Sequence, residues 1–145
     1  MKNTKYKVLV DTDVLMDFVT KREPFDIEAA QLFNLADKNL IDLFVSSLCL
    51  NNVYYLVRKQ IGHKNTIGLL IRLVEVVDVL SVDKQVVMKA LTSRFNDFED
   101  ALQHFTAVEN SNIDVIVTRN LKDYKHSSIA IMTAGSFVSL KKIMK

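Results

Sequence analysis

The chain of 145 residues has little cysteine, proline or glycine, with one, one and three of these residues respectively. The single cysteine, Cys49, cannot form an internal disulfide or a cysteine-based zinc site, and it fits a reducing cytoplasm, where we expect the protein to reside. So few glycines and prolines exclude a flexible linker and the many tight turns of an all-β sandwich. We therefore expect residues 1–145 to form a single, helix-rich domain.

Long apolar runs and a strong excess of one charge are also absent. The longest apolar region, residues 67–80, is interrupted by Arg72, Glu75 and Asp78, so we expect no membrane-spanning segment and no membrane partner. The opening residues lack the apolar core of a signal peptide. Nineteen basic and seventeen acidic residues give a net charge of +2, far below that of a dedicated electrostatic nucleic-acid binder. Net charge therefore does not indicate a function.

What the sequence does contain is an alternation of short apolar runs with segments of helical periodicity. Strands are predicted at residues 7–10, 43–45, 76–79, 114–118 and 129–132. Helices are predicted at residues 13–20, 27–38, 47–60, 64–74, 83–95, 97–109 and 136–143. Strands that alternate with helices form a parallel sheet covered on both faces. We predict an α/β protein, a three-layer α/β/α sandwich with a four- to five-stranded, mostly parallel sheet.

Acidic and polar side chains follow two of the predicted strands. Asp11 and Asp13 come at the end of the first strand, and Thr118, Asn120 and Asp123 follow the fourth. In an open parallel sheet, ligands bind outside the carboxyl ends of the strands. We therefore expect these side chains to share one edge of the sheet.

A third segment, the helix predicted at residues 97–109, brings carboxylates to the same edge. At about 100° per residue, Asp97 and Asp100 lie on one stripe beside the buried face of this helix. Separate segments thus deliver Asp11, Asp100 and Asp123 to one place. Carboxylates this close repel one another unless a cation neutralises them, and oxygen ligands without cysteine or clustered histidine select Mg²⁺ or Mn²⁺. Such an ion promotes phosphoester hydrolysis.

The start of this helix resembles a capping box. Asn96 is the predicted cap, and Glu99, three residues later, is the predicted partner that reaches back to it. We therefore expect Glu99 to point away from the other acids.

Three motifs in this order resemble those of the PIN domain family. They are Val-Leu-Val-Asp-Thr-Asp-Val-Leu at 8–15, Asp-Phe-Glu-Asp-Ala-Leu-Gln at 97–103 and Ile-Val-Thr-Arg-Asn-Leu-Lys-Asp-Tyr at 116–124. The third is similar to the family's Thr-Arg-Asn-x-x-Asp-Phe element, and the resemblance covers nearly the whole chain. The family consists of metal-dependent ribonucleases and includes the toxins of VapBC-type toxin–antitoxin systems.

The resemblance implies the roles of five residues. Asp11, Asp100 and Asp123 match the family's acids, which bind Mg²⁺ or Mn²⁺ and are catalytic, while Thr118 and Asn120 match polar groups that orient the site. We expect a water activated by metal at Asp11 and Asp100 to attack an RNA phosphodiester. Asp123 and Asn120 would then orient the water ligands of the metal.

Three further residues are predicted to orient the site rather than to hold the metal directly. Asp13 and Asp97 lie in or next to the first turns of helices, where a capping role competes with a role in the site. Asn52 stands where many family members carry a glutamate, so one negative charge is lost and a second metal ion is in doubt. We expect one firmly held ion.

Two alternatives remain at this point. Asn52 favours a catalytically weak or silent PIN-like module that binds RNA without cleaving it. Residues 8–15 also fit the opening of a haloacid-dehalogenase-type phosphatase, with Asp11 as nucleophile, although the lysine motif and late acidic pair of that fold are not found. The PIN resemblance further implies an RNA substrate, an antitoxin protein and a homodimer, and the sequence assigns no RNA-binding residues.

Overall fold

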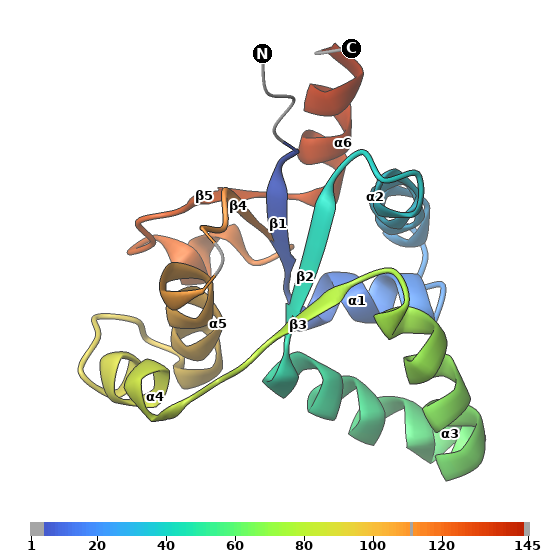
Figure 1. The fold of residues 1–145 in the computed structure, drawn as a ribbon, viewed down its shortest axis with the longest axis horizontal. Coiled ribbons are helices and arrows are strands. Elements are labelled where there is room, and N and C mark those ends of the chain that lie inside the picture. Colours follow the sequence, from blue (N-terminus) through green and yellow to red (C-terminus); the bar gives the residue numbers. More distant parts are fainter. Residues whose placement is uncertain (1–4, 111, 144–145) are drawn as a thin grey trace.

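Five parallel strands form the sheet at the centre of the computed structural model, which describes residues 5–110 and 112–143 (Figure 1). Their order is β3-β2-β1-β4-β5. The strands are β1 (Lys7–Val10), β2 (Asp42–Ser46), β3 (Asp78–Leu80), β4 (Val115–Val117) and β5 (Ala130–Met132). The helices are α1 (Thr12–Val19), α2 (Asp26–Asp37), α3 (Ser47–Val74), α4 (Lys84–Leu91), α5 (Phe98–Glu109), the 3₁₀ helix η1 (Leu121–Tyr124) and α6 (Ala134–Ile143).

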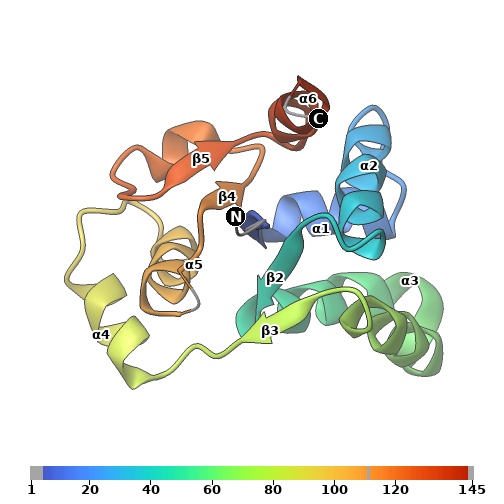
Figure 2. The same ribbon diagram turned by 45° about the horizontal axis from the view of Figure 1, so that its top comes forward.

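Helices cover both faces of the sheet, as predicted. Side chains alternate along β1: Val8 and Val10 pack in a core with side chains of α1, α2, α3 and α6, whereas Leu9 packs on the other face with residues of α5, β4 and η1. Helix α4 extends this second layer by packing on α5. Figure 2 shows α4 and α5 on the opposite side of the strands from α1, α2 and α3. The α/β prediction is confirmed.

The position of β1 in the middle of the sheet decides where the polar motifs meet. It pairs in parallel with β2 on one side and with β4 on the other, so that Val10 lies opposite Val117. Two adjacent parallel strands that end in register place the residues after them side by side. Asp11 and Thr118 are therefore neighbours at the carboxyl edge of the sheet.

Helix α3 consists of two helical stretches joined at a kink, in agreement with the prediction. The sequence predicted helices at residues 47–60 and 64–74, and the backbone leaves the helical conformation between them, at Gly62. Gly62 has φ 82° and ψ 168°, a left-handed backbone conformation that favours glycine. None of the helices in the described residues is long and apolar enough to cross a bilayer.

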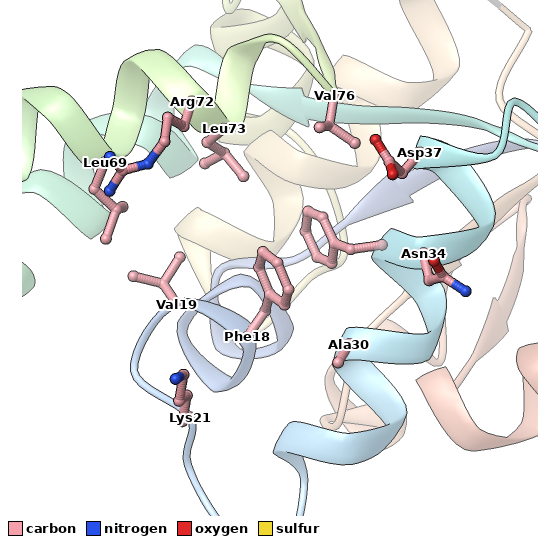
Figure 3. A pocket seen from close by; sticks show the side chains of 11 residues that line it. Phe18, Val19, Lys21, Ala30, Asn34, Asp37, Leu69, Arg72, Leu73 and Val76 are labelled. Atoms are coloured by element: carbon pink, nitrogen blue, oxygen red, sulfur yellow. The ribbon is translucent and has the colours of Figure 1, made fainter.

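An apolar pocket of about 500 Å³ lies between α1, α2 and the second half of α3 (Figure 3). The rings of Phe18 and Phe33 stack in its wall with centroids 4.1 Å apart. Leu69, Leu73 and Val76 contribute from α3 and the segment after it. None of the residues that line this pocket belongs to the three polar motifs, so it is separate from the site described next.

Candidate active site

Asp11 is the residue on which the three motifs converge. It is buried directly after β1, and its backbone N–H donates to the carbonyl of Val117 at 3.0 Å, which fixes it beside the end of β4. Its side chain also caps α1 by accepting from the backbone N–H of Thr12. A capping role was considered for Asp13, but in the structure Asp11 itself is the cap.

The Asp11 carboxylate accepts four hydrogen bonds from four different segments. Oδ1 accepts from the Thr12 backbone N–H at 2.8 Å and from Nε2 of Gln103 at 3.3 Å. Oδ2 accepts from the hydroxyls of Thr118 and Tyr124, each at 3.0 Å. These donors offset the desolvation of a buried carboxylate. Their number also makes Asp11 the most firmly positioned acid of the site.

A pocket of about 260 Å³ opens beside Asp11, and we call it the acidic pocket. Its lining comprises Asp11, Thr12, Asp13, Met16, Arg22, Leu56, Glu99, Asp100 and Asn120. The structure thus brings together the strand-end acids and the acids that begin α5. Two of the three predicted metal ligands, Asp11 and Asp100, share this pocket.

Crowding and burial raise the pKa of several acids in this pocket. The pKa of Asp100 rises to about 7, first because the side chain is buried and then because the charges of Asp11 and Asp97 lie near it. Burial and then the Asp11 charge raise the pKa of Asp13 to about 6. The pKa of Glu99 is raised by the same two causes. A bound cation would relieve this repulsion.

The donor set suits a hard divalent cation that keeps part of its water shell. Within residues 5–110 and 112–143, no three histidine, cysteine, aspartate or glutamate side chains are grouped so that they could hold a metal ion by themselves. Mg²⁺, however, usually takes only one or two protein carboxylates and retains several waters. The carboxylates of Asp11 and Asp100 in one pocket fit that requirement.

Asp123, the third predicted ligand, lies elsewhere. It is exposed on η1 and lines a different hollow, together with Asn96, Lys122, Lys125 and His126. The next residue, Tyr124, is the one whose side chain reaches Asp11. The structure therefore does not place the Asp123 side chain in the acidic pocket.

The predicted capping box at the start of α5 was wrong by one residue. The cap is Asp97, whose carboxylate accepts from the backbone N–H of Asp100 at 2.9 Å. Glu99 is consequently the second residue of the helix and lines the acidic pocket. There Nδ2 of Asn52 donates to Oε1 of Glu99 at 3.1 Å. The Asn52 amide thus binds the carboxylate of Glu99, which was predicted to point away from the other acids.

Polar residues after β4 connect the walls of the pocket. The Thr118 hydroxyl donates to Asp11 and accepts from the backbone N–H of Asn120 at 3.0 Å. The backbone N–H of Arg119 donates to Oδ2 of Asp13 at 3.1 Å. Thr118 and Asp13, for which orienting roles were predicted, are thus both tied to the segment after β4.

Sequence analysis missed three residues that hold this arrangement. Gln103 and Tyr124 donate to Asp11, and Arg119 forms a bidentate ion pair with the buried Asp17 at 2.8 and 3.1 Å. All three lie inside the quoted motifs. The signal for Gln103 was a polar residue three positions after Asp100 on the same side of a helix.

Comparison with known proteins supports a family assignment. The sequence profile of the PIN domain family matches residues 7–122. Ribonuclease VapC1 of Aquifex aeolicus (strain VF5) is 26% identical in an alignment of 136 residues that covers 90% of this chain and 92% of the relative.

Solved structures share the fold at lower sequence identity. DNA-bound VapBC from Salmonella typhimurium matches with a TM-score of 0.67 and 20% identity, over 89% of this chain and 98% of that chain. VapBC2 from Rickettsia felis, bound to a DNA fragment from its promoter, matches with a TM-score of 0.65 and 17% identity, over 87% and 96%.

Proposed function

This chain belongs to the PIN domain family, and from that premise we propose that it is an endoribonuclease that hydrolyses RNA phosphodiester bonds with Mg²⁺ or Mn²⁺. The observation that carries the proposal is the meeting of Asp11 and Asp100 in one acidic pocket at the carboxyl edge of the sheet. The relative named Ribonuclease VapC1, similar over 90% of this chain, supports RNA as the substrate.

Several residues in and around the acidic pocket have a definable task in this reaction. A divalent ion held by Asp11 and Asp100 would stabilise charge on the phosphoryl oxygens and lower the pKa of a bound water. Thr118 and Tyr124 fix the orientation of the Asp11 carboxylate through their hydroxyls. Asp97 fixes the first turn of α5, which carries Asp100. Asn120 is exposed and lines the pocket, where its amide would orient a water ligand of the ion.

The alternative of an RNA-binding module without catalysis was motivated by the neutral Asn52. The structure weakens this reason for expecting an inactive module. Asn52 donates to Glu99, and Glu99 lines the pocket with Asp11 and Asp100. A carboxylate is therefore present beside position 52. The phosphatase alternative has no support, since the PIN profile covers residues 7–122.

We also propose that the protein is the toxin of a toxin–antitoxin pair and that an antitoxin protein is its partner. The structures from Salmonella typhimurium and Rickettsia felis are VapBC complexes, which supports a partner of this kind. The apolar pocket of Figure 3 offers about 500 Å³ lined by Phe18, Phe33 and Leu73 to an apolar segment of such a partner. The homodimer stays a prediction.

We expect the purified protein to cleave single-stranded RNA when Mg²⁺ or Mn²⁺ is added and to stop when EDTA removes the ion. The measurement is gel analysis of a labelled RNA over a metal titration. A preparation of Asp100→Asn purified in the same way controls for contaminating nuclease. RNA that is bound but intact at every metal concentration would instead establish the silent binding module.

A pair of substitutions tests the role of Glu99. Asn52→Glu is expected to leave the Mn²⁺ affinity within about threefold, because Glu99 already provides a carboxylate at this wall, whereas Glu99→Gln should weaken it about tenfold. Isothermal titration calorimetry measures both affinities. Glu75→Gln, which removes an exposed acid after α3, is the matched control. An affinity gain of more than about tenfold in Asn52→Glu would show that the amide is a deficit.

A further inference from the structure

A second hollow, of about 360 Å³, lies between η1 and the segment that leads into α5. Its lining is Asn96, Lys122, Asp123, Lys125 and His126, and we call it the basic hollow. The sequence motifs and the proposed reaction leave its cations without a role.

The basic hollow and the acidic pocket are built on the same two segments. Asn96 directly precedes Asp97, the cap of the helix that carries Glu99 and Asp100. On the other side, Asn120 lines the acidic pocket and directly precedes η1. A linear polymer bound in one of these two hollows can therefore extend into the other.

The short helix that carries the cations of the basic hollow is anchored to Asp11. Tyr124, the last residue of η1, is buried and donates to Asp11 at 3.0 Å, which anchors the short helix. In a 3₁₀ helix, side chains three residues apart eclipse each other. Lys122 and Lys125 have that spacing, and the backbone N–H of Lys125 donates to the carbonyl of Lys122. Both side chains therefore leave the backbone on the same side of this segment.

The charges around the hollow favour an anion. The ion pairs found in the described residues involve neither Lys122 nor Lys125. His126 and the Asn96 amide add further polar groups, and Asp123 is the acid on the lining. The charge of Asp123 also helps to raise the pKa of Asp100, so the two hollows lie within electrostatic reach of each other.

RNA that enters the acidic pocket meets repulsion from several carboxylates, and a net charge of +2 does little to offset it. Lysine binds phosphate as a point charge, and such contacts set the position of a nucleic acid without reading its sequence. We propose that the basic hollow binds a backbone phosphate of the RNA that flanks the phosphate cleaved in the acidic pocket. This inference rests on the proposed ribonuclease function.

The test compares two double variants that remove the same charge. Lys122→Gln/Lys125→Gln empties the hollow of its ammonium groups, and Lys59→Gln/Lys64→Gln removes two exposed lysines from α3. Fluorescence anisotropy in EDTA measures the binding of a labelled single-stranded RNA at several salt concentrations. We expect the first variant to bind about tenfold more weakly and to lose about 0.7 from the slope of log K against log salt, as for one phosphate contact. The α3 variant should change little.

Cleavage kinetics give the second readout. In Mn²⁺, the hollow variant should lose activity through a higher KM rather than a lower kcat, and Lys122→Arg/Lys125→Arg should recover binding because it keeps both charges. Equal weakening in the hollow and α3 variants would overturn the inference and leave only an effect of net charge. If the wild type cleaves no RNA, the ribonuclease proposal fails, while the anisotropy comparison still decides whether the hollow binds RNA.

Discussion

Asp11→Asn is expected to lower the free energy of unfolding by about 2–4 kcal/mol and to reduce RNA cleavage by at least about 10³-fold. The Asp11 carboxylate accepts four hydrogen bonds at a buried position. An asparagine has one acceptor oxygen, so its amide nitrogen would face donors, and at least one of them would stay buried without a partner. The loss of a charged ligand accounts for the effect on cleavage.

Denaturant unfolding and RNA cleavage of the same preparation measure both effects. Asp78→Asn, which neutralises an exposed acid on the edge strand β3, is the matched control and should leave both quantities within experimental scatter. An unfolding free energy of Asp11→Asn equal to that of the wild type would contradict the hydrogen-bond network around Asp11.

Asp100→Asn should also abolish cleavage, but it should raise the free energy of unfolding by about 1–3 kcal/mol at pH 8 without divalent ions. The pKa of Asp100 is raised from 3.8 to about 7 by burial and by neighbouring acids. Between about pH 4 and pH 7 the folded protein keeps a proton on Asp100 that the unfolded chain releases. The free energy of unfolding therefore falls as the pH rises through this range. Above pH 7 Asp100 is charged in both states, and its full destabilising effect on the fold is present.

The measurement is the difference in unfolding free energy between the wild type and Asp100→Asn at pH 5 and pH 8 in EDTA. The stabilisation by the substitution should be larger at pH 8, because the wild-type carboxyl is mostly protonated at pH 5. The pKa of Asp13 is also raised, to about 6, so this residue too lowers the free energy of unfolding as the pH rises. It does so in the wild type and in the variant alike. A variant less stable than the wild type at pH 8 would show that Asp100 has a structural role.

The same substitution at two acids of one pocket thus has opposite effects on stability. Asp11 is surrounded by donors, whereas Asp100 is surrounded by other carboxylates. An acid that costs stability in the free protein is typical of a functional site, since a ligand compensates for it.

The sheet and its polar edge could be predicted from the sequence. The alternation of apolar runs with segments of helical periodicity predicts an α/β fold. The polar motifs that follow parallel strands then lie at a common edge of the sheet. The pairing of Val10 with Val117 then places Asp11 beside Thr118, as expected. Asp100 could be predicted because helical periodicity puts it beside a buried face.

Other features depend on details that periodicity does not resolve. A cap at Asn96 would have made Glu99 the partner that reaches back to it, but with Asp97 as the cap Glu99 is the second residue of α5 and lines the acidic pocket. The direction of Tyr124 depends on the short helix η1, which carries no periodic pattern in four residues. Asp123 lies in the basic hollow for the same reason.

We propose that Asp11 and Asp100 together hold the divalent ion that RNA cleavage requires. Calorimetric titration of Mn²⁺ at pH 8 into the wild type and into Asp100→Asn tests it most directly, because the variant is expected to be folded and more stable. We expect the wild type to bind Mn²⁺ and the variant to lose at least about tenfold in affinity. Equal Mn²⁺ affinity in the two proteins would contradict it.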